Sequence, residues 1–261
     1  MSHISNSQIN ATRVTRGAGF LALGALAALL LLPSAGASPT SKSKESFPHL
    51  STLTNAKIGH WAPVVRVAGA HFKPSASSYV ITRLPLTTSD GTQNVVLILS
   101  EDDVSPSQVW YKVRLPILPN NSTGWVPKSA LGNVYIVHTH LYVDRAKQTL
   151  VLKKDGKTIF STRVGVGKTA PGWGPTPPGQ YYIRDKLTNF NDPFYGPVAF
   201  GTSARSAVLT EWPGGGFVGV HGTNEPGLIP GYISHGCIRL VNTAILKLAK
   251  LMSVGTPLTV T

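Results

Sequence analysis

The sequence predicts a mainly β protein built from two small domains, and three observations support this fold class. Short β-branched and aromatic runs recur along the chain, each bounded by Gly, Pro, Ser, Asn or Asp. One segment near the C-terminus, residues 242–252, has the apolar spacing of an amphipathic helix. The chain of 261 residues, 42% of them hydrophobic, is long enough for each domain to bury its own core without a disulfide.

The first 37 residues are interpreted as an export signal. Arg13 and Arg16 precede an uncharged, mostly apolar run over residues 17–33, and a small-residue pattern typical of signal-peptidase sites follows and ends at Ala37. The alternative is an uncleaved membrane anchor, although the run is slightly shorter than the ~20 apolar residues that span a bilayer. Either interpretation places the rest of the chain outside the cytoplasmic membrane, in the periplasm or the cell wall.

The charge balance is strongly basic. The formal net charge is +13 at pH 7, and removal of residues 1–37 takes away two arginines and leaves +11. Such a charge favours a polyanionic partner. Nucleic acid is not expected, because little of it lies outside the membrane and the chain has no run of five or more Lys or Arg. An anionic cell wall or membrane surface fits this location, and plain solubility is the alternative explanation.

Residues 38–58 are interpreted as a flexible linker, because the segment begins with small polar residues. Residues 59–132 are predicted to form a small barrel or sandwich of antiparallel strands, since short β-branched runs alternate there with turn-rich segments. The Gly-Trp-Val-Pro sequence that begins at Gly124 resembles the end of a bacterial SH3-like domain, which implies a binding module. The predicted strands lie at residues 64–67, 79–84, 95–100, 109–115 and 124–131.

Residues 133–261 are predicted to form a second β domain with one or two short helices. Asp155 and Gly156 stand between two strand-like runs, residues 149–154 and 158–164, and together they are a strong hairpin signal.

Three further elements complete this half. The Pro- and Gly-rich residues 169–179 are predicted to form a loop over the sheet. An amphipathic helix is predicted over residues 242–252, with Asn242 as its N-cap. A terminal strand is predicted over residues 257–261.

The chain contains one cysteine, Cys237, in the sequence Ser-His-Gly-Cys-Ile-Arg-Leu over residues 234–240. Exported proteins commonly use cysteines for disulfides, and a lone cysteine can form none within its chain. A thiol becomes a strong nucleophile only as its thiolate, so it needs a neighbouring group that takes its proton. A histidine has a suitable pKa for this role.

Two histidines are candidates for that base. His221 lies sixteen residues before Cys237, and the Gly- and Pro-rich segment between them can turn the chain so that two strand ends meet. His235 lies two residues before Cys237 and would share its side on an extended segment. Spacing alone leaves both candidates open.

The residues beside Cys237 suit acyl transfer. Gly236 leaves the backbone uncrowded, so a substrate carbonyl could approach the amide groups of residues 236 and 237 as an oxyanion hole. Arg239 places a permanent cation nearby, which could hold the thiolate or a substrate carboxylate.

Two other interpretations of these residues compete with catalysis. A lone cysteine is commonly a buried and inert small hydrophobe. A metal site at His221, His235 and Cys237 is not expected, because the usual paired-ligand pattern and a fourth ligand are missing. His138 and His140 would share one strand face and could bind a metal, but ordinary half-buried strand histidines are the favoured interpretation.

Residues 221–240, HGTNEPGLIPGYISHGCIRL, resemble the signature of the L,D-transpeptidase catalytic domain family. The preceding VGVGK and GPTPPGQYYI segments resemble the strand and the Thr-Pro-x-Gly turn ahead of that family's site, and the resemblance covers about residues 134–261. Pro178 departs from the family, which usually has a small or hydroxyl residue there. The resemblance implies a β-sandwich in which Cys237 is the acylated nucleophile and His221 the proton donor and acceptor. It also implies a supporting role for His235, an oxyanion or substrate-binding role for Ser234, Gly236 and Gly222, and support of the thiolate or substrate by Arg239.

The function implied by this resemblance is peptidoglycan cross-linking. The thiolate would attack the amide after the third residue of a stem tetrapeptide and expel the terminal D-alanine, and the side-chain amine of another stem would accept the acyl group in a 3-to-3 link. No metal or organic cofactor is implied, and carbapenems would acylate the same thiol. With water as acceptor, the enzyme would be an L,D-carboxypeptidase. The alternative from another class is a noncatalytic wall-binding protein that holds the cell-wall polymer through the SH3-like domain.

Overall fold

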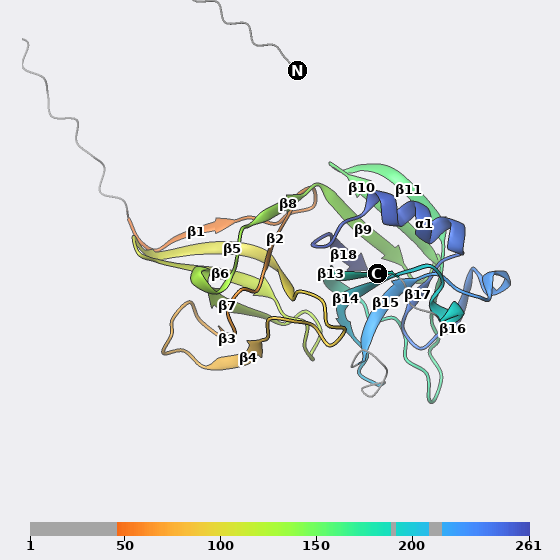
Figure 1. The fold of residues 1–261 in the computed structure, drawn as a ribbon, viewed down its shortest axis with the longest axis horizontal. Coiled ribbons are helices and arrows are strands. Elements are labelled where there is room, and N and C mark those ends of the chain that lie inside the picture. The colour runs from red at the N-terminus through yellow and green to blue at the C-terminus, as the bar shows by residue number, and fades with distance from the viewer. Residues whose placement is uncertain (1–45, 189–191, 209–215) are drawn as a thin grey trace, which may run out of the picture. The chain divides into compact units, whose positions relative to one another are not determined.

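The computed structural model describes residues 46–188, 192–208 and 216–261 (Figure 1). The expected export signal, residues 1–37, and the start of the expected linker lie outside the described residues. All described residues belong to one compact unit, Glu45–Thr261. In this part of the chain no helix has the length and apolar character needed to cross a membrane.

The fold is mainly β, as predicted, and its first part is one antiparallel sheet. The strand order is β4-β3-β7-β6-β5-β2-β8, and β1 pairs with β5 beside this path. Its core contains Ala62, Val96, Ile98, Val113 and Val126, all of which are fully buried. The strands are β1 (His49–Thr52), β2 (Gly59–Pro63), β3 (Ala68–His71), β4 (Val80–Leu84), β5 (Val95–Ser105), β6 (Gln108–Arg114), β7 (Thr123–Pro127) and β8 (Tyr135–Val137).

The bounds of this sheet differ from the predicted segments at both ends. β1 lies within the stretch interpreted as linker and pairs with β5, with His49 opposite Asp103. β8 lies beyond residue 132 and pairs with β2, with Gly59 opposite Val137. The 3-10 turn η1 (Lys128–Ala130) ends the segment that was predicted to be wholly strand. The SH3-like character of the sheet stays a prediction.

The second sheet contains ten strands in the order β11-β10-β9-β18-β13-β14-β15-β17-β12-β16. The last strand in sequence, β18, therefore lies in the interior of the sheet, between β9 and β13 (Figure 1). The strands are β9 (Thr139–Asp144), β10 (Thr149–Lys154), β11 (Lys157–Arg163), β12 (Gly165–Gly167), β13 (Gly179–Thr188), β14 (Val198–Arg205), β15 (Phe217–His221), β16 (Gly231–Ser234), β17 (Ile238–Arg239) and β18 (Pro257–Val260). The short 3-10 turns η2 (Pro193–Tyr195) and η3 (Pro226–Leu228) lie in its connections.

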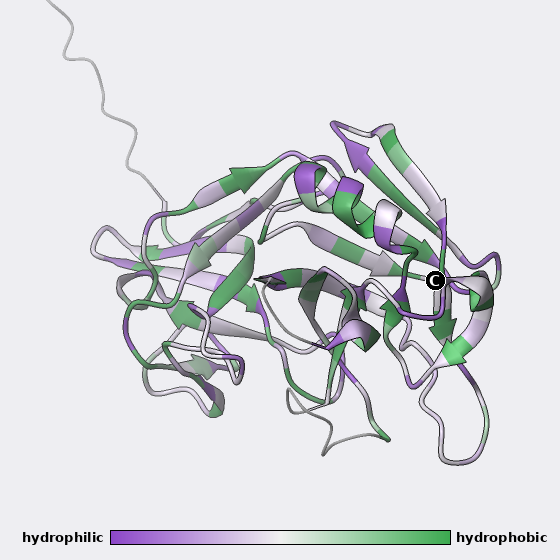
Figure 2. Cartoon of the chain, turned by 45° about the vertical axis from the view of Figure 1, so that its right-hand side comes forward, coloured by the Kyte–Doolittle hydropathy of each residue, from purple (hydrophilic) through white to green (hydrophobic). Residues whose placement is uncertain are grey.

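The predicted hairpin and helix are both present. Asp155 and Gly156 have φ values of 51° and 82° and connect β10 to β11, as the hairpin signal required. The helix α1 (Asn242–Leu251) buries Ala244, Ile245 and Leu248 and lies against β14. Figure 2 shows the hydrophobic and hydrophilic bands that alternate along it.

The predicted N-cap of α1 is wrong. The cap residue is Val241, which makes no side-chain capping bond. The side chain of Asn242 is directed elsewhere, because its Oδ1 accepts a hydrogen bond of 2.9 Å from the Thr223 N–H. Asn242 thus ties the helix start to the segment that follows β15.

Candidate active site

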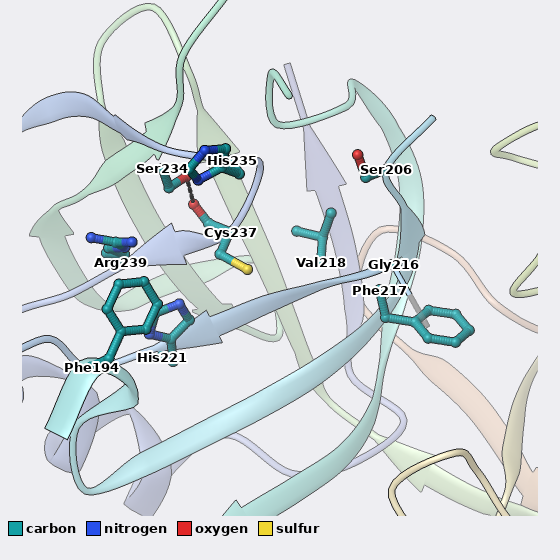
Figure 3. Close-up of a pocket in the computed structure, with 10 residues that line it drawn as sticks. All are labelled: Phe194, Ser206, Gly216, Phe217, Val218, His221, Ser234, His235, Cys237 and Arg239. Carbon is teal, nitrogen blue, oxygen red and sulfur yellow. Dashed lines mark hydrogen bonds between the residues drawn. The ribbon is translucent and has the colours of Figure 1, made fainter. Parts of the chain in front are cut away.

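The parallel pairing of β15 with β17 brings His221 and the Cys237 segment together. Val220 is opposite Ile238 and His221 is opposite Arg239 in this pairing, and Cys237 immediately precedes β17. A pocket opens at this point (Figure 3). Its lining residues are Phe194, Ser206, Gly216, Phe217, Val218, His221, Ser234, His235, Cys237 and Arg239.

Gly219 lies next to both the thiol and the imidazole. A Cβ built at Gly219 would lie 3.7 Å from Cys237 Sγ and 3.5 Å from His221 Cδ2. The Gly219 N–H also donates a 3.3 Å hydrogen bond to Cys237 Sγ. The sulfur and the ring therefore face the same side of β15, which is the arrangement that the sequence predicted for His221.

The tautomer of His221 follows from its neighbour. Its Nδ1 lies 2.7 Å from the Gly222 carbonyl oxygen, which can only accept a hydrogen bond, so Nδ1 carries the proton. Nε2 then has a free lone pair, and among the described residues this buried atom has no hydrogen-bond partner. Burial lowers the pKa of His221 to about 4, against the opposing effect of the Gly222 carbonyl. The imidazole is therefore a neutral base at physiological pH.

Cys237 rests as a thiol. Burial raises the pKa of its Sγ–H, and the Gly219 N–H and the Arg239 charge offset this only in part. The side chain is partly exposed to the pocket. Because both Cys237 and His221 are neutral at rest, nucleophilic attack by Sγ would require transfer of its proton to a base such as His221 Nε2.

Ser234 and Gly236 shape the turn that presents Cys237. The Ser234 hydroxyl donates to the Cys237 carbonyl at 2.5 Å, and its oxygen accepts from the Gly236 N–H at 3.2 Å. Gly236 has φ of +123°, a conformation that side chains disfavour. The expected pair of oxyanion donors is therefore reduced, because the Gly236 amide is already engaged and the Cys237 amide is the remaining candidate.

Thr176 is a positioning residue that sequence reasoning missed. Its hydroxyl accepts from the Gly167 N–H and donates to the Gly236 carbonyl, both at 2.8 Å, and the side chain is fully buried. It thus fixes the turn beside Cys237 to β12. The signal was present in the Thr-Pro-x-Gly motif, which was interpreted as a turn without a role for its threonine.

Arg239 is buried and lines the same pocket as Cys237 and His221. Its guanidinium pairs with Glu225 at 3.3 Å and lies 4.2 Å from the centre of the Phe194 ring. Its charge lowers the pKa of both His221 and Cys237 as a secondary cause. Phe194 and Glu225 carry no sequence signal that reveals these contacts, because both lie in connections between strands.

His235 and Gly222, the other two residues expected at the site, do not lie between Cys237 Sγ and the His221 ring. The chain bends at His235, so this residue is not on the extended segment that was expected. The imidazole stacks on Trp173, with ring centres 4.0 Å apart and planes at 3°, at the edge of the pocket. Gly222 supplies the carbonyl that fixes the His221 tautomer, and a Cβ there would overlap Asn242 Oδ1 at 2.3 Å.

The two strand histidines do not form a metal site. His138 is exposed and its Nδ1 lies 2.8 Å from Asp155 Oδ1, whereas His140 is buried and its Nε2 lies 2.8 Å from Thr259 Oγ1. Within the described residues, no three His, Cys, Asp or Glu side chains gather in a way that could hold a metal ion.

Comparisons with known proteins point to the same half of the chain. The candidate L,D-transpeptidase YkuD of Bacillus subtilis (strain 168) is 29% identical over 130 residues, which cover 50% of this chain and 70% of that protein. The candidate L,D-transpeptidase YqjB of the same strain is 28% identical over 138 residues, which cover 50% and 72%. The NMR structure of the catalytic domain of the E. faecium L,D-transpeptidase aligns with 47% of this chain and 96% of that domain, at 27% identity and a TM-score of 0.34. Residues 138–260, which hold both Cys237 and His221, match the model of the YkuD family, the L,D-transpeptidase catalytic domain.

Proposed function

We propose that this protein is an exported cysteine L,D-transpeptidase that forms 3-to-3 cross-links between peptidoglycan stem peptides. The observation that carries the proposal is that neutral His221, whose Nε2 has no hydrogen-bond partner within the described part of the chain, lies on the same side of β15 as the Cys237 thiol. The family match over residues 138–260 supports peptidoglycan as the substrate class.

The first half of the reaction would form a thioester. As Cys237 Sγ attacks the carbonyl carbon of the third stem residue, its proton passes to His221 Nε2, and the carbonyl oxygen becomes an oxyanion that the Cys237 amide can stabilise. The intermediate then collapses, the C–N bond to the terminal D-alanine breaks, and His221 returns the proton to the leaving amine. The Nδ1–H contact to the Gly222 carbonyl holds the imidazole in the tautomer whose Nε2 can accept and return the proton.

The second half would transfer the acyl group. The side-chain amine of another stem's third residue attacks the thioester carbon and gives a proton to His221 Nε2. The C–S bond breaks, an amide forms, and the sulfur regains its proton from His221. With water in place of the amine, the same steps would release a tripeptide.

The choice of acceptor can be tested with purified tetrapeptide-stem muropeptides. We expect mass spectrometry to detect cross-linked dimers that have lost one D-alanine, and no product from the Cys237→Ala variant. Tripeptides without dimers would reassign the protein as an L,D-carboxypeptidase. Equal cellular function of the wild type and Cys237→Ala, with no acyl-enzyme in either, would favour the noncatalytic wall-binding protein.

The first sheet is proposed to hold the cell-wall polymer. A groove on it is lined by Ser75, Ser77, Gln108 and Lys128, whose polar groups suit sugar hydroxyl and amide groups. Co-sedimentation with purified sacculi tests this role. We expect Gln108→Ala to weaken co-sedimentation without changing the acylation of Cys237, and unchanged co-sedimentation would remove the groove from the proposal.

Export is proposed from residues 1–37 alone. N-terminal sequencing of the protein recovered from the cell envelope should begin near Ser38 if the signal is cleaved. An intact N-terminus in the membrane fraction would identify an anchor instead.

A further inference from the structure

A second, strongly basic crevice adjoins the Cys237 pocket. Its lining includes three arginines, Arg83, Arg184 and Arg205, and no Asp or Glu. Phe217 lines both the crevice and the Cys237 pocket, and Figure 3 shows its ring directed away from Cys237. The remaining lining residues are Thr82, Leu84, Pro85, Thr87, Thr88, Ser89, Asn94, Pro116 and Ile117.

Arg184 is a buried arginine in this crevice, and its surroundings leave part of its guanidinium without hydrogen-bond partners in the described residues. Its side chain is 4% exposed, and within the described residues its buried Nε and Nη1 atoms have no hydrogen-bond partner. The residue lies at a bulge in β13, where the register against β14 shifts between Ile183 and Asp185, and such bulges redirect side chains. Its Cζ lies 3.9 Å from the centre of the Phe217 ring.

The neighbouring acidic residue, Asp185, interacts with the Arg184 charge, but the two side chains form no direct ion pair in the described residues. Burial raises the pKa of Asp185, and the Arg184 charge lowers it in part. Asp185 Oδ1 accepts a 2.8 Å hydrogen bond from the Gly201 N–H. A second guanidinium adds to the positive charge, because Arg205 Cζ lies 4.7 Å from the centre of the same Phe217 ring. Phe217 therefore has two cations against its ring.

A buried guanidinium with two nitrogens that lack hydrogen-bond partners in the described residues is costly, and proteins rarely retain one. The planar guanidinium is suited to bind a carboxylate through two parallel hydrogen bonds. We propose that Arg184, assisted by Arg205, binds a free carboxylate of the stem peptide whose scissile amide lies at Cys237. Phe217 would lie between the reacting end of the peptide and this carboxylate. The inference rests on the proposed function for the identity of the peptide.

Binding can be measured without turnover by isothermal titration calorimetry on the full-length Cys237→Ala protein. Two probes are compared at constant ionic strength: a stem tetrapeptide with free carboxylates, and the same peptide with its carboxylates converted to primary amides. We expect the free peptide to bind ~10-fold or more tightly, since a hydrogen bond to a charged group contributes about 1.5–3 kcal/mol.

A second variant assigns this preference to the crevice. In the Cys237→Ala background, Arg184→Met should abolish the preference for the free peptide, whereas Arg163→Met removes the same charge from an exposed site on β11 and should retain it. The comparison of the two peptides on the unaltered crevice does not depend on the folding of Arg184→Met. Equal binding of both peptides, no binding of either, or a preference that survives Arg184→Met would each overturn the inference.

The proposed function has a separate readout. Acyl-enzyme formation by the wild-type protein tests the chemistry at Cys237, and it does not require a preference for the free peptide. Turnover of both peptides with equal KM would overturn the carboxylate site and leave the transpeptidase intact. Preferential binding of the free peptide without any acyl-enzyme would support the carboxylate site and overturn the proposed transpeptidase function.

Discussion

Cys237 Sγ and His221 Cδ2 lie so close to Gly219 that one methyl group on that residue would contact both. Both contacts, at 3.7 Å and 3.5 Å, are ordinary van der Waals distances, so the methyl group fits without moving either side chain. A small group at this position would therefore interfere with proton transfer while the fold is preserved.

Gly219→Ala should slow acylation of Cys237 by ~100-fold, because the methyl group would prevent the closer approach of Sγ and the imidazole that proton transfer requires, and a misplacement of about 1 Å has effects of this size. The rate is measured by intact-protein mass spectrometry after addition of a carbapenem. Gly227→Ala is the matched control, because a Cβ at Gly227 meets no atom within 4 Å. Acylation of Gly219→Ala at the wild-type rate would show that the proton of Cys237 does not move to His221 past the Gly219 position.

The pH dependence of acylation should reflect the low pKa of His221, which burial brings to about 4. The neutral base is lost only as the pH falls through the pKa of the folded protein, so acylation should persist well below pH 6 and decline toward pH 4. The pH profile of the second-order acylation rate measures this directly. An acidic inflection near pH 6.5, the value of an unperturbed histidine, would contradict His221 as the base.

The same burial predicts a loss of stability in acid. Burial also lowers the pKa of His140 to about 4, so between pH 6.5 and 4 the unfolded chain binds more protons than the folded chain at both histidines. The free energy of unfolding should therefore fall with decreasing pH, by on the order of 1–2 kcal/mol for each histidine at pH 5. Urea unfolding at pH 7 and pH 5 measures the loss, and it should be smaller in His140→Gln. An identical loss in His140→Gln would show that protonation of His140 does not contribute to the loss of stability in acid.

Thr176→Val should destabilise the protein and slow acylation together. The substitution keeps the size of the side chain but leaves the Gly167 N–H and the Gly236 carbonyl without their hydroxyl partner. A buried polar group that loses its partner costs about 1–3 kcal/mol. Thr176→Ser keeps the hydroxyl and should restore most of both properties. Thermal unfolding and the acylation rate are the measurements, and a stable, fully active Thr176→Val would exclude the role of Thr176 in positioning Cys237.

The sequence predicts most of the fold because its signals are local. The φ values of Asp155 and Gly156, the apolar spacing of α1 and the runs that became β5 and β6 each depend on a few consecutive residues. The pairing of β8 with β2 depends on residues more than seventy positions apart, so no local pattern indicates it.

In the candidate active site too, some features could be predicted from the sequence and others could not. Residue type and spacing named Cys237 as the candidate nucleophile and left His221 and His235 as candidate bases, and only the family resemblance favoured His221. The engagement of the Gly236 amide and the side-chain bond of Asn242 to Thr223 were not predictable, because both result from competition between nearby hydrogen-bond partners. Thr176 lies sixty residues from its carbonyl partner Gly236, and its role emerges only when the chain is folded.

The interior position of β18 sets an order of assembly. Leu258 pairs with Leu141 of β9 on one side and with Tyr181 of β13 on the other, so the second sheet stays split into two halves until this late segment has been synthesised. A nascent chain that has not yet reached residue 257 has two unpaired strand edges, which are the surfaces through which β proteins aggregate. The sheet that carries Cys237 is therefore joined into one piece only by β18, which leaves the ribosome after every other strand described in this protein.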